Sequence, residues 1–357
     1  MSKTYKVVVV GVGKRGMHHA ATFKANSRFE LVGIAGRDKA KLDAAAAKLN
    51  GVQASTDIAG LTKSLKPDVF CFCTPPSVRT DLIQLGVEAG AKLIAFEKPV
   101  ALSTAEGMTI KKLLDDSGVK GVVSHQHRYG IHYRKVKEII ASGGLGRIHT
   151  VYGTATGWMS HMMSHLIDYT RWYNGEAEAE WAIAQAAGRS KLSDNHPSPD
   201  HIAGFVQFSN GVRGVYECGA GAPDQPEVGK WWGKNRIGAQ GTEGFAEVLT
   251  NGGWRAVTKS GGFRRVGGAM THDQDMPPYI QEIADWLDND AKVHQCNFNS
   301  AYKGLEIMMA LCRSVVEGGQ IQLPLSSGSD EIAALREKLP AKRVLFGLTD
   351  SAKEYPQ

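Results

Sequence analysis

The chain has 357 residues, of which 42% are hydrophobic and 22% are charged, which is the composition of an ordinary soluble globular protein. The length predicts about two domains. The formal net charge is +6 without a block of Lys or Arg, which argues against a nucleic-acid partner and suits an anionic cofactor. No apolar run approaches the ~20 residues of a membrane span, and the first strand begins too early for a signal peptide. We therefore expect a cytoplasmic protein with neither a membrane nor a nucleic-acid partner.

The stretch that organises the chain is its N-terminal segment YKVVVVGVGKRG. Val7–Val10 form a continuous apolar run, typical of a central parallel strand that is buried on both faces. Gly11, Gly13 and Gly16 follow in the spacing G-x-G-x-x-G and lead into a predicted helix over Met17–Phe23. The first glycine permits a tight turn, the second leaves room for a pyrophosphate, and the third lets helix and strand approach closely. The helix N-terminus would present unpaired N–H groups to the phosphates.

The end of the second predicted strand bears on the choice of cofactor. Phe29–Ala35 predicts a buried strand that ends beside the adenosine ribose in a dinucleotide-binding fold. An acid there would favour NAD, but the sequence has Gly36 followed by Arg37, which can accommodate a 2′-phosphate and favours NADP over NAD. In the alternative interpretation Arg37 is simply solvated and Asp38 caps the next helix, predicted over Lys39–Leu49.

Three further strands end at the same ligand-binding edge of the predicted parallel sheet. They are expected over Val69–Thr74, Lys92–Phe96 and Lys120–Ser124. Lys98 follows the second of them and precedes a proline, so a stiff backbone would position its ammonium group, which could act in proton transfer if its pKa falls towards neutrality. A solvated surface lysine is the alternative. The candidate cofactor-binding residues are therefore Gly11, Gly13, Lys14, Arg15, Gly16, Gly36, Arg37, Thr74, Pro75, Glu97 and Lys98.

The second half of the chain predicts a different domain. After a helix over Tyr133–Ala141, the sequence becomes rich in alternating strand patterns joined by hairpin turns such as Asn210-Gly211. We expect a doubly wound Rossmann domain over residues 1–126, an α+β substrate and oligomerisation domain with a large, mostly antiparallel, open-faced sheet over 127–325, and a surface tail over 326–357. The five cysteines include no C-x-x-C pair, and we expect Cys71 and Cys73 to be reduced core residues.

Together these features resemble the Gfo/Idh/MocA family of glucose–fructose oxidoreductase and inositol dehydrogenase relatives, from Lys6 to about Leu325. The G-x-G-x-x-G turn is shared with many enzymes, whereas Glu-Lys-Pro at this distance from it is far more specific. The residues that carry the resemblance are GVGKRG, Glu97-Lys98-Pro99, Arg128 in HQHRY, GGLGRI, His165 with Asp168, Asn210-Gly211, Gly241-Thr-Glu-Gly244 and Leu323-Pro324.

The resemblance implies roles for particular residues. Lys98 matches the lysine that contacts the substrate hydroxyl and the nicotinamide, and His165 matches the histidine taken as the acid or base. Arg128, Trp158 and Asp168 are the candidate substrate-binding residues. Family members mostly oxidise or reduce sugars, cyclitols and their derivatives, and the open face of their second-domain sheet commonly forms dimers or tetramers. We expect a homodimer or homotetramer.

His161 departs from the family pattern, because relatives often carry an acid four residues before the histidine. If the segment is helical, His161 and His165 share one face. His161 then replaces the acid as an orienter or proton relay, or is a bystander, or binds metal with its neighbour. Met162 occupies the place of Glu in H-E-x-x-H, so the zinc-protease motif fails, and we expect no metal.

The function that follows is an NAD(P)-dependent interconversion of hydroxyl and carbonyl on a sugar, cyclitol or related polyol, with Lys98, His165 and His161 as the candidate catalytic residues. One alternative is a glycosidase that oxidises its sugar transiently and leaves the dinucleotide unchanged overall. The other is a non-catalytic regulator that senses dinucleotides.

Overall fold

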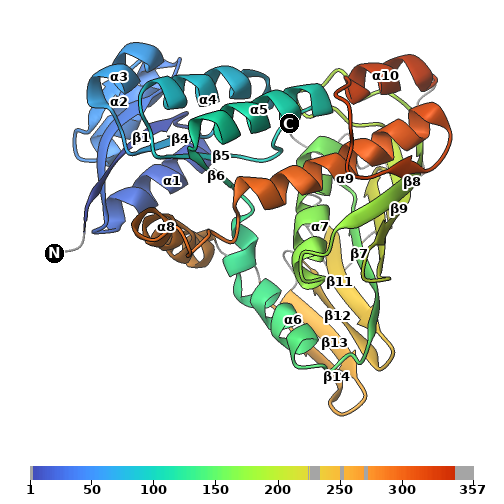
Figure 1. The fold of residues 1–357 in the computed structure, drawn as a ribbon. Helices are drawn as coiled ribbons and strands as arrows, with labels where there is room; N and C mark the ends of the chain where they lie inside the picture. The colour runs from blue at the N-terminus through green and yellow to red at the C-terminus, as the bar shows by residue number, and fades with distance from the viewer. Residues whose placement is uncertain (1–2, 224, 226–233, 250–252, 269–271, 342–357) are drawn as a thin grey trace. The chain divides into compact units, whose positions relative to one another are not determined.

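The computed structural model describes residues 3–223, 225, 234–249, 253–268 and 272–341. The chain forms two compact units, shown by their elements in Figure 1. Unit 1 consists of Met1–Ala101, Glu106–Tyr129 and His272–Ala301, and unit 2 of Leu102–Ala105, Gly130–Thr271 and Tyr302–Gln357. The division expected from the sequence differs most in residues 272–301, which it assigned to the second domain. It also placed residues 102–105 in the first domain and 127–129 in the second, and it separated 326–357 as a tail.

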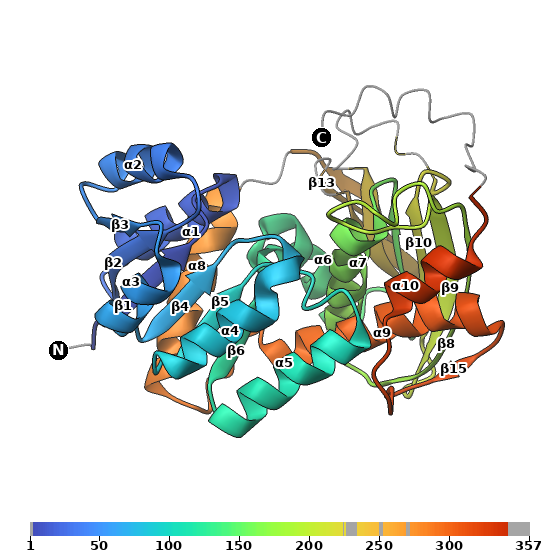
Figure 2. The same cartoon turned by 90° about the horizontal axis from the view of Figure 1, so that it is seen from above.

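Unit 1 contains a six-stranded sheet in the order β3-β2-β1-β4-β5-β6 (Figure 2). Every pair of neighbouring strands is parallel, so the predicted doubly wound Rossmann sheet is confirmed. The strands are β1 (Tyr5–Val10), β2 (Phe29–Ala35), β3 (Gln53–Ser55), β4 (Val69–Phe72), β5 (Leu93–Phe96) and β6 (Lys120–Val123). The sequence did not predict β3, whose three residues are too few to show a periodic pattern.

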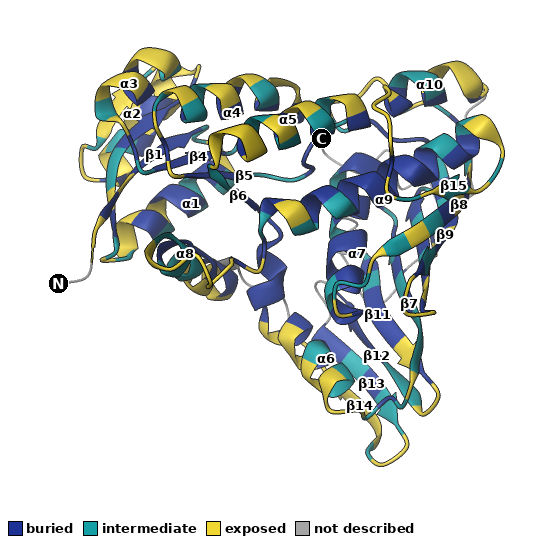
Figure 3. Cartoon of the chain, in the orientation of Figure 1, coloured by how far each residue is buried: buried dark blue, intermediate teal, exposed yellow. Residues whose placement is uncertain are grey.

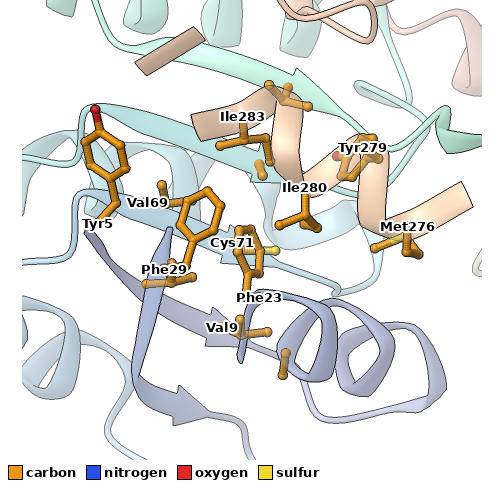
Figure 4. Close-up of a cluster of buried hydrophobic side chains, with 14 of the residues drawn as sticks. Tyr5, Val9, Phe23, Phe29, Val69, Cys71, Met276, Tyr279, Ile280 and Ile283 are labelled. Carbon is orange, nitrogen blue, oxygen red and sulfur yellow. The ribbon is translucent and has the colours of Figure 1, made fainter. Parts of the chain in front are cut away.

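The helices around this sheet follow the expected βα alternation. They are α1 (Lys14–Ala25), α2 (Lys39–Lys48), α3 (Ile58–Leu65), the 3-10 turn η1 (Pro76–Val78), α4 (Arg79–Glu88), α5 (Thr104–Ser117), the 3-10 turn η2 (Gln126–Tyr129) and α8 (His272–Asp288). Figure 4 shows why α8 belongs to this unit: its Tyr279, Ile280 and Ile283 join one buried cluster with Val69 and Cys71 of β4. A helix that begins 200 residues after the end of β4 thus completes the core of the Rossmann sheet.

Unit 2 contains a nine-stranded sheet in the order β14-β13-β12-β11-β7-β10-β9-β8-β15. Only the described pair of β10 with β7 is parallel, so the predicted large, mostly antiparallel sheet is confirmed. The strands are β7 (Ile148–Ala155), β8 (Ala179–Ala187), β9 (His201–Phe208), β10 (Arg213–Gly219), β11 (Asn235–Gly241), β12 (Gly244–Leu249), β13 (Gly253–Thr258), β14 (Gly262–Val266) and β15 (Ile321–Gln322).

Helices cover one face of the sheet in unit 2. A Cβ atom added at Gly153 of β7 would lie 2.7 Å from Leu166, and one added at Gly204 of β9 would lie 2.6 Å from Leu311. These glycines therefore let α7 and α9 approach the strands closely. The helices of the unit are α6 (Ile131–Ala141), α7 (Met159–Tyr173), α9 (Phe298–Glu317, which begins in unit 1) and α10 (Glu331–Lys338).

The segment after residue 325 includes an anchored helix. Leu335 of α10 is fully buried, and Glu331 accepts a hydrogen bond from the Arg313 guanidinium at 2.8 Å. The remainder of the expected tail, residues 342–357, lies outside the described residues. All five cysteines are free thiols, and all but Cys73 are buried. No helix in the described ranges is long and apolar enough to cross a membrane.

Candidate active site

The turn between β1 and α1 has the geometry that its glycines predict. Gly11 has a φ of +90°, and a Cβ atom there would lie 2.4 Å from the carbonyl oxygen of Cys73. A Cβ atom at Gly16 would lie 1.6 Å from the carbonyl oxygen of Gly11, whereas one at Gly13 would meet no atom within 4 Å. Gly11 and Gly16 are therefore required by the fold, because a side chain at either position would collide with the backbone. Gly13 has no such constraint and leaves open space beside the turn.

The polar groups around this turn fit an anionic diphosphate. The N-cap residue of α1, Gly13, offers no side-chain cap, and the first turn carries no acid, so its N–H groups and the helix dipole favour an anion. Thr74 Oγ1 and Arg15 Nη1 are buried, and neither has a hydrogen-bond partner among the described residues. Buried polar atoms normally find partners, and a dinucleotide phosphate supplies acceptors. Lys14 is exposed in the same turn, and Pro75 follows Thr74 after β4.

The end of β2 offers space and one positive charge. A Cβ atom at Gly36 would come no closer than 3.8 Å to Leu42 and Val12, and Arg37 is exposed. Asp38 is the N-cap of α2 and accepts a hydrogen bond from the backbone of Lys41 at 3.1 Å. The capping part of the alternative interpretation is thus confirmed, and the described geometry leaves the role of Arg37 a prediction.

Glu97, directly after β5, is held by two cationic side chains of α1. Arg15 Nε lies 3.2 Å from its Oε1 atom, and His19 Nε2 lies 3.5 Å from the same oxygen. The His19 ring, which is 1% exposed, also contacts Ser124 Oγ through Nε2 at 3.2 Å and Cys71 Sγ through Nδ1 at 3.7 Å. The carboxylate before Lys98 therefore has a fixed position.

The backbone of Lys98 is held by Arg79, a fully buried residue at the start of α4. Its guanidinium donates to the carbonyl oxygen of Lys98 at 3.1 Å and to that of Pro99. The same guanidinium lies over the ring of Phe96, 5.8 Å from its centroid. The stiff frame predicted around Lys98 is therefore present, and it is built from side chains as well as from proline.

Burial and charge set the protonation of these groups. Burial lowers the pKa of Lys98 to about 8, with Arg79 and Arg15 adding to the fall and Glu97 opposing it. Burial disfavours the ionised Glu97, but the His19 hydrogen bond and the charges of Arg15 and His19 outweigh it and hold its pKa well below the usual range. For His19 itself, burial is outweighed by Cys73 and Glu97, and its pKa rises to about 9.

The Cys73 thiol beside His19 remains protonated at neutral pH. The hydrogen bond with Cys71 and burial raise the pKa of Cys73 well above that of an ordinary thiol, so Glu97 is the anion that stabilises the imidazolium. The ligand atoms of His19, Cys71 and Cys73 lie within 4.8 Å of one another. A metal ion would need thiolate ligands here, and the surroundings of Cys73 disfavour its thiolate.

In unit 2, α7 presents two histidines. From Met159 to Arg171 every residue is buried except His161 and His165, and Figure 3 shows this helix coloured as buried over most of its length. The segment is helical, as the shared-face interpretation required. His165 Nδ1 lies 3.2 Å from the hydroxyl of Tyr169 one turn later, which orients its ring.

The remaining predicted substrate residues have distinct surroundings. Trp158 is the N-cap residue of α7 and is partly exposed, whereas Asp168 is 2% exposed within the helix. Arg128 of η2 is buried and donates to the carbonyl oxygen of Gln295 at 3.0 Å and to Ser300 Oγ at 3.2 Å. These contacts give Arg128 a structural role in unit 1, and its contact with substrate stays a prediction.

The sequence analysis missed His19 and Arg79. Their partners Glu97 and Lys98 lie 78 and 19 residues away, and neither separation matches a helical or strand period. The one available signal for His19 was its place three residues after Gly16 on α1, on the face that closes against the strands.

The chain is similar to known oxidoreductases in sequence and in fold. Residues 5–125 match the sequence model of the GFO_IDH_MocA family, described as an oxidoreductase family with an NAD-binding Rossmann fold. The inositol 2-dehydrogenase of Rhizobium meliloti (strain 1021) is 24% identical over 233 residues, which are 59% of this chain and 68% of that protein. The scyllo-inositol 2-dehydrogenase (NADP(+)) of Bacillus subtilis (strain 168) is 29% identical over 131 residues, 32% of this chain and 36% of that protein.

Solved structures share the fold over nearly the whole chain. Levoglucosan dehydrogenase in complex with NADH and levoglucosan has a TM-score of 0.76 at 17% identity, covering 90% of this chain and all of that one. With the sequence match over residues 5–125, this confirms the predicted resemblance to the Gfo/Idh/MocA family of oxidoreductases, whose NAD-binding Rossmann model that segment matches.

Proposed function

We propose that the protein is an NAD(P)-dependent dehydrogenase or reductase that interconverts a hydroxyl and a carbonyl group on a sugar, cyclitol or related polyol. The observation that carries this proposal is Lys98. Lys98 is a partly buried residue, its backbone is held by Arg79, and its pKa is lowered by burial to about 8. Relatives named as inositol dehydrogenases and a structural neighbour bound to levoglucosan support the substrate class.

The side chains of this protein would divide the work as follows. The Gly11–Gly16 turn, Thr74 and Arg15 would hold NAD(P), which when bound supplies a ring that accepts or gives a hydride. The Lys98 ammonium would donate a hydrogen bond to the reacting oxygen of the substrate and stabilise negative charge that develops there. His165, oriented by Tyr169, would take the hydroxyl proton during oxidation and return it during reduction.

His161 would assist His165 as an orienter or proton relay in place of the acid found in relatives. The two histidines lie one helical turn apart and are the accessible residues of that part of α7. A neutral imidazole can accept a proton near pH 7. His161→Gln is expected to reduce turnover less than His165→Gln, because only the latter removes the proposed base.

The proposed cofactor preference is NADP. Gly36 carries no acid to accept from the ribose hydroxyls, Asp38 is used in capping α2, and the exposed Arg37 can pair with a 2′-phosphate. The ratio of kcat/KM for NADP to that for NAD measures this preference, and Arg37→Ala should lower it.

The proposed assembly is a homodimer or homotetramer formed through the face of the sheet in unit 2 that carries Ile183 and Phe205, opposite the face that packs against α7 and α9. Ile183, Phe205, Val215 and Tyr152 lie in register across β8, β9, β10 and β7. Ile183 is 38% and Phe205 is 54% exposed. A contiguous apolar row of this kind is typical of an interaction surface.

The experiment that tests the proposed function is product analysis with purified protein, dinucleotide and a panel of inositols, sugars and glycosides. Net reduction of the dinucleotide together with a ketone product is the expected result. Release of an aglycone without net change in the dinucleotide would indicate the glycosidase chemistry instead. Tight dinucleotide binding without turnover of any panel member, together with a stoichiometric protein partner, would indicate a regulator.

A further inference from the structure

A loop of unit 2 is clamped onto the start of α7. It runs from Gly188 to Asp200 between β8 and β9. Ser198 Oγ accepts a hydrogen bond from the backbone N–H of Met159 at 2.9 Å, and Ser160 Oγ donates to the carbonyl oxygen of Pro197 at 2.5 Å. These contacts fix the loop against the same end of α7 that carries His161.

A second clamp comes from α10. Arg336 Nη2 donates to the carbonyl oxygen of Leu192 at 2.6 Å, and Arg189 Nη1 donates to the carbonyl oxygen of Arg336 at 2.7 Å. The backbones of Lys191 and Ser198 pair as an isolated bridge inside the loop. The loop is therefore held at both sides, and the side chains that it presents have defined positions.

The loop adds nitrogen bases beside those of α7. The ring of His196 stands edge-on to the ring of His161, with centroids 5.1 Å apart. The Lys191 ammonium lies 5.3 Å from the ring centroid of Trp158, the N-cap residue of α7. Both loop residues are partly exposed, as are Trp158 and His161, so a ligand from solvent can reach all four side chains.

The loop itself contains two acidic side chains, Asp194 and Asp200. Asp200 is 3% exposed, and its carboxylate accepts from the backbone N–H and hydroxyl of Ser190. Asp194 lies 3.7 Å from Lys191 Nζ, but exposed pairs at this distance contribute about 0–1 kcal/mol. The first turn of α7 contains no acid. Among the described residues, the loop and the first turn of α7 thus contribute one ammonium group and two imidazoles that can bind an anion.

We propose that Lys191, His196 and His161 form a subsite for a carboxylate group of the substrate, next to an aromatic platform provided by Trp158. The substrate would then be a sugar acid or cyclitol acid and not its neutral counterpart. This inference rests on the proposed function, which it narrows to one substrate class. An ammonium and an imidazolium donate charge-assisted hydrogen bonds to a carboxylate, and an indole face suits the apolar face of a pyranose ring.

The first test is binding, measured on the full chain with NADP present. Histidine side-chain NMR signals are followed during titration with D-glucuronate, D-galacturonate, and the matched neutral sugars D-glucose and D-galactose. The expected result is a saturable shift of the His161 and His196 signals with the acids alone. Equal shifts with the neutral sugars, or unchanged signals with both acids, would overturn the inference.

The second test uses variants of the loop. Lys191→Met and His196→Gln should each raise the Kd for the uronates about tenfold, the size expected for one charge-assisted hydrogen bond, and leave weak binding of the neutral sugars unchanged. Asn195→Ala, an exposed change in the same loop, is the control and should leave both constants unchanged. Uronate affinity that does not respond to either loop variant contradicts the subsite.

The two levels of proposal fail separately. If the uronates bind through this loop but no dinucleotide is reduced with any panel member, the subsite stands and the dehydrogenase proposal falls. If a neutral polyol is oxidised efficiently and uronates do not bind, the dehydrogenase proposal stands and the carboxylate subsite falls.

Discussion

His19 Nε2 lies 3.5 Å from the carboxylate of Glu97, the residue immediately before Lys98. A side chain on the buried face of α1 therefore stabilises the strand end that carries the proposed catalytic ammonium. Because Arg15 of the same helix holds the same oxygen, α1 and the Glu-Lys-Pro segment are joined by one network of ion pairs.

Replacing His19 tests this ion-pair network through its effect on the free energy of unfolding. The pKa of His19 is about 9 in the folded protein and 6.5 in an unfolded chain, so the folded state binds the extra proton between these values. Its contribution is fully present below pH 6.5 and is lost as the pH rises towards 9. His19→Gln should lower the free energy of unfolding by about 1–3 kcal/mol at pH 6.5, and by much less at pH 9, in urea titrations.

His18→Gln is the matched control, because this neighbour is partly exposed and its pKa is lowered by burial and by Arg15. A lowered pKa moves its stability contribution below pH 6.5, so the control should not change the slope above that value. Lys98 contributes a slope of opposite sign only above about pH 8. An unchanged slope between pH 6.5 and 8 in the His19 variant would contradict the ion pair.

The glycine turn offers a pair of variants that separates folding from cofactor binding. Gly16→Ala should cost more than about 3 kcal/mol of stability, because its Cβ atom would lie 1.6 Å from the Gly11 carbonyl oxygen. Gly13→Ala meets no protein atom and has a φ of −71°, so its stability should change by less than about 0.5 kcal/mol. Its Kd for dinucleotide should rise about tenfold or more. Calorimetry gives both quantities, and normal dinucleotide affinity of the Gly13 variant would count against the proposed phosphate site.

The preference for NADP over NAD is tested by introducing a carboxylate at Gly36. Gly36→Asp places a carboxylate where the nearest side-chain atoms are 3.8 Å away, so the fold should accept it. The new acid can accept from both ribose hydroxyls and would repel a 2′-phosphate. The ratio of kcat/KM for NADP to NAD should fall about tenfold or more, while Lys39→Ala, an exposed residue paired with Asp43, should leave it unchanged. A ratio that rises or stays constant would refute the placement of the ribose at this strand end.

The proposal that the apolar row on the sheet of unit 2 forms the subunit interface is tested by measuring the mass of the protein in solution. Phe205→Glu introduces a charge at the most exposed member of the row, which should break the assembly into protomers in light scattering with little loss of protomer stability. Phe263→Glu on the edge strand β14 is the control, since Phe263 is 65% exposed and lies outside the row. An unchanged mass for the Phe205 variant would show that this face is not the interface.

The sequence predicted those features that depend on neighbouring residues. The valine run, the three glycines and the Asp38 cap each act within a few positions, and the parallel order of strands follows from βα alternation. The position of α8 could not be predicted in this way. Its Tyr279 and Ile283 complete a core whose other members begin at residue 5, and no local pattern encodes that contact.

The same limit applies to the site. Lys98 was identified from its place after a strand, but its clamp by Arg79 and the pairing of His19 with Glu97 depend on tertiary contacts. The contact of His196 with His161 likewise joins a loop to a helix across 35 residues of sequence. Side chains that act together over such distances become visible only when the fold is known.

The central claim is that Lys98 and His165 act on the same substrate oxygen, and a double-mutant cycle of kcat tests it most directly. Lys98→Met and His165→Gln should each lower turnover by about 10²–10⁴-fold with dinucleotide affinity nearly unchanged. Because residues that serve one step are strongly non-additive, the double variant should be scarcely slower than the slower single variant. Losses that multiply in the double variant, or normal turnover in either single variant, would contradict the claim.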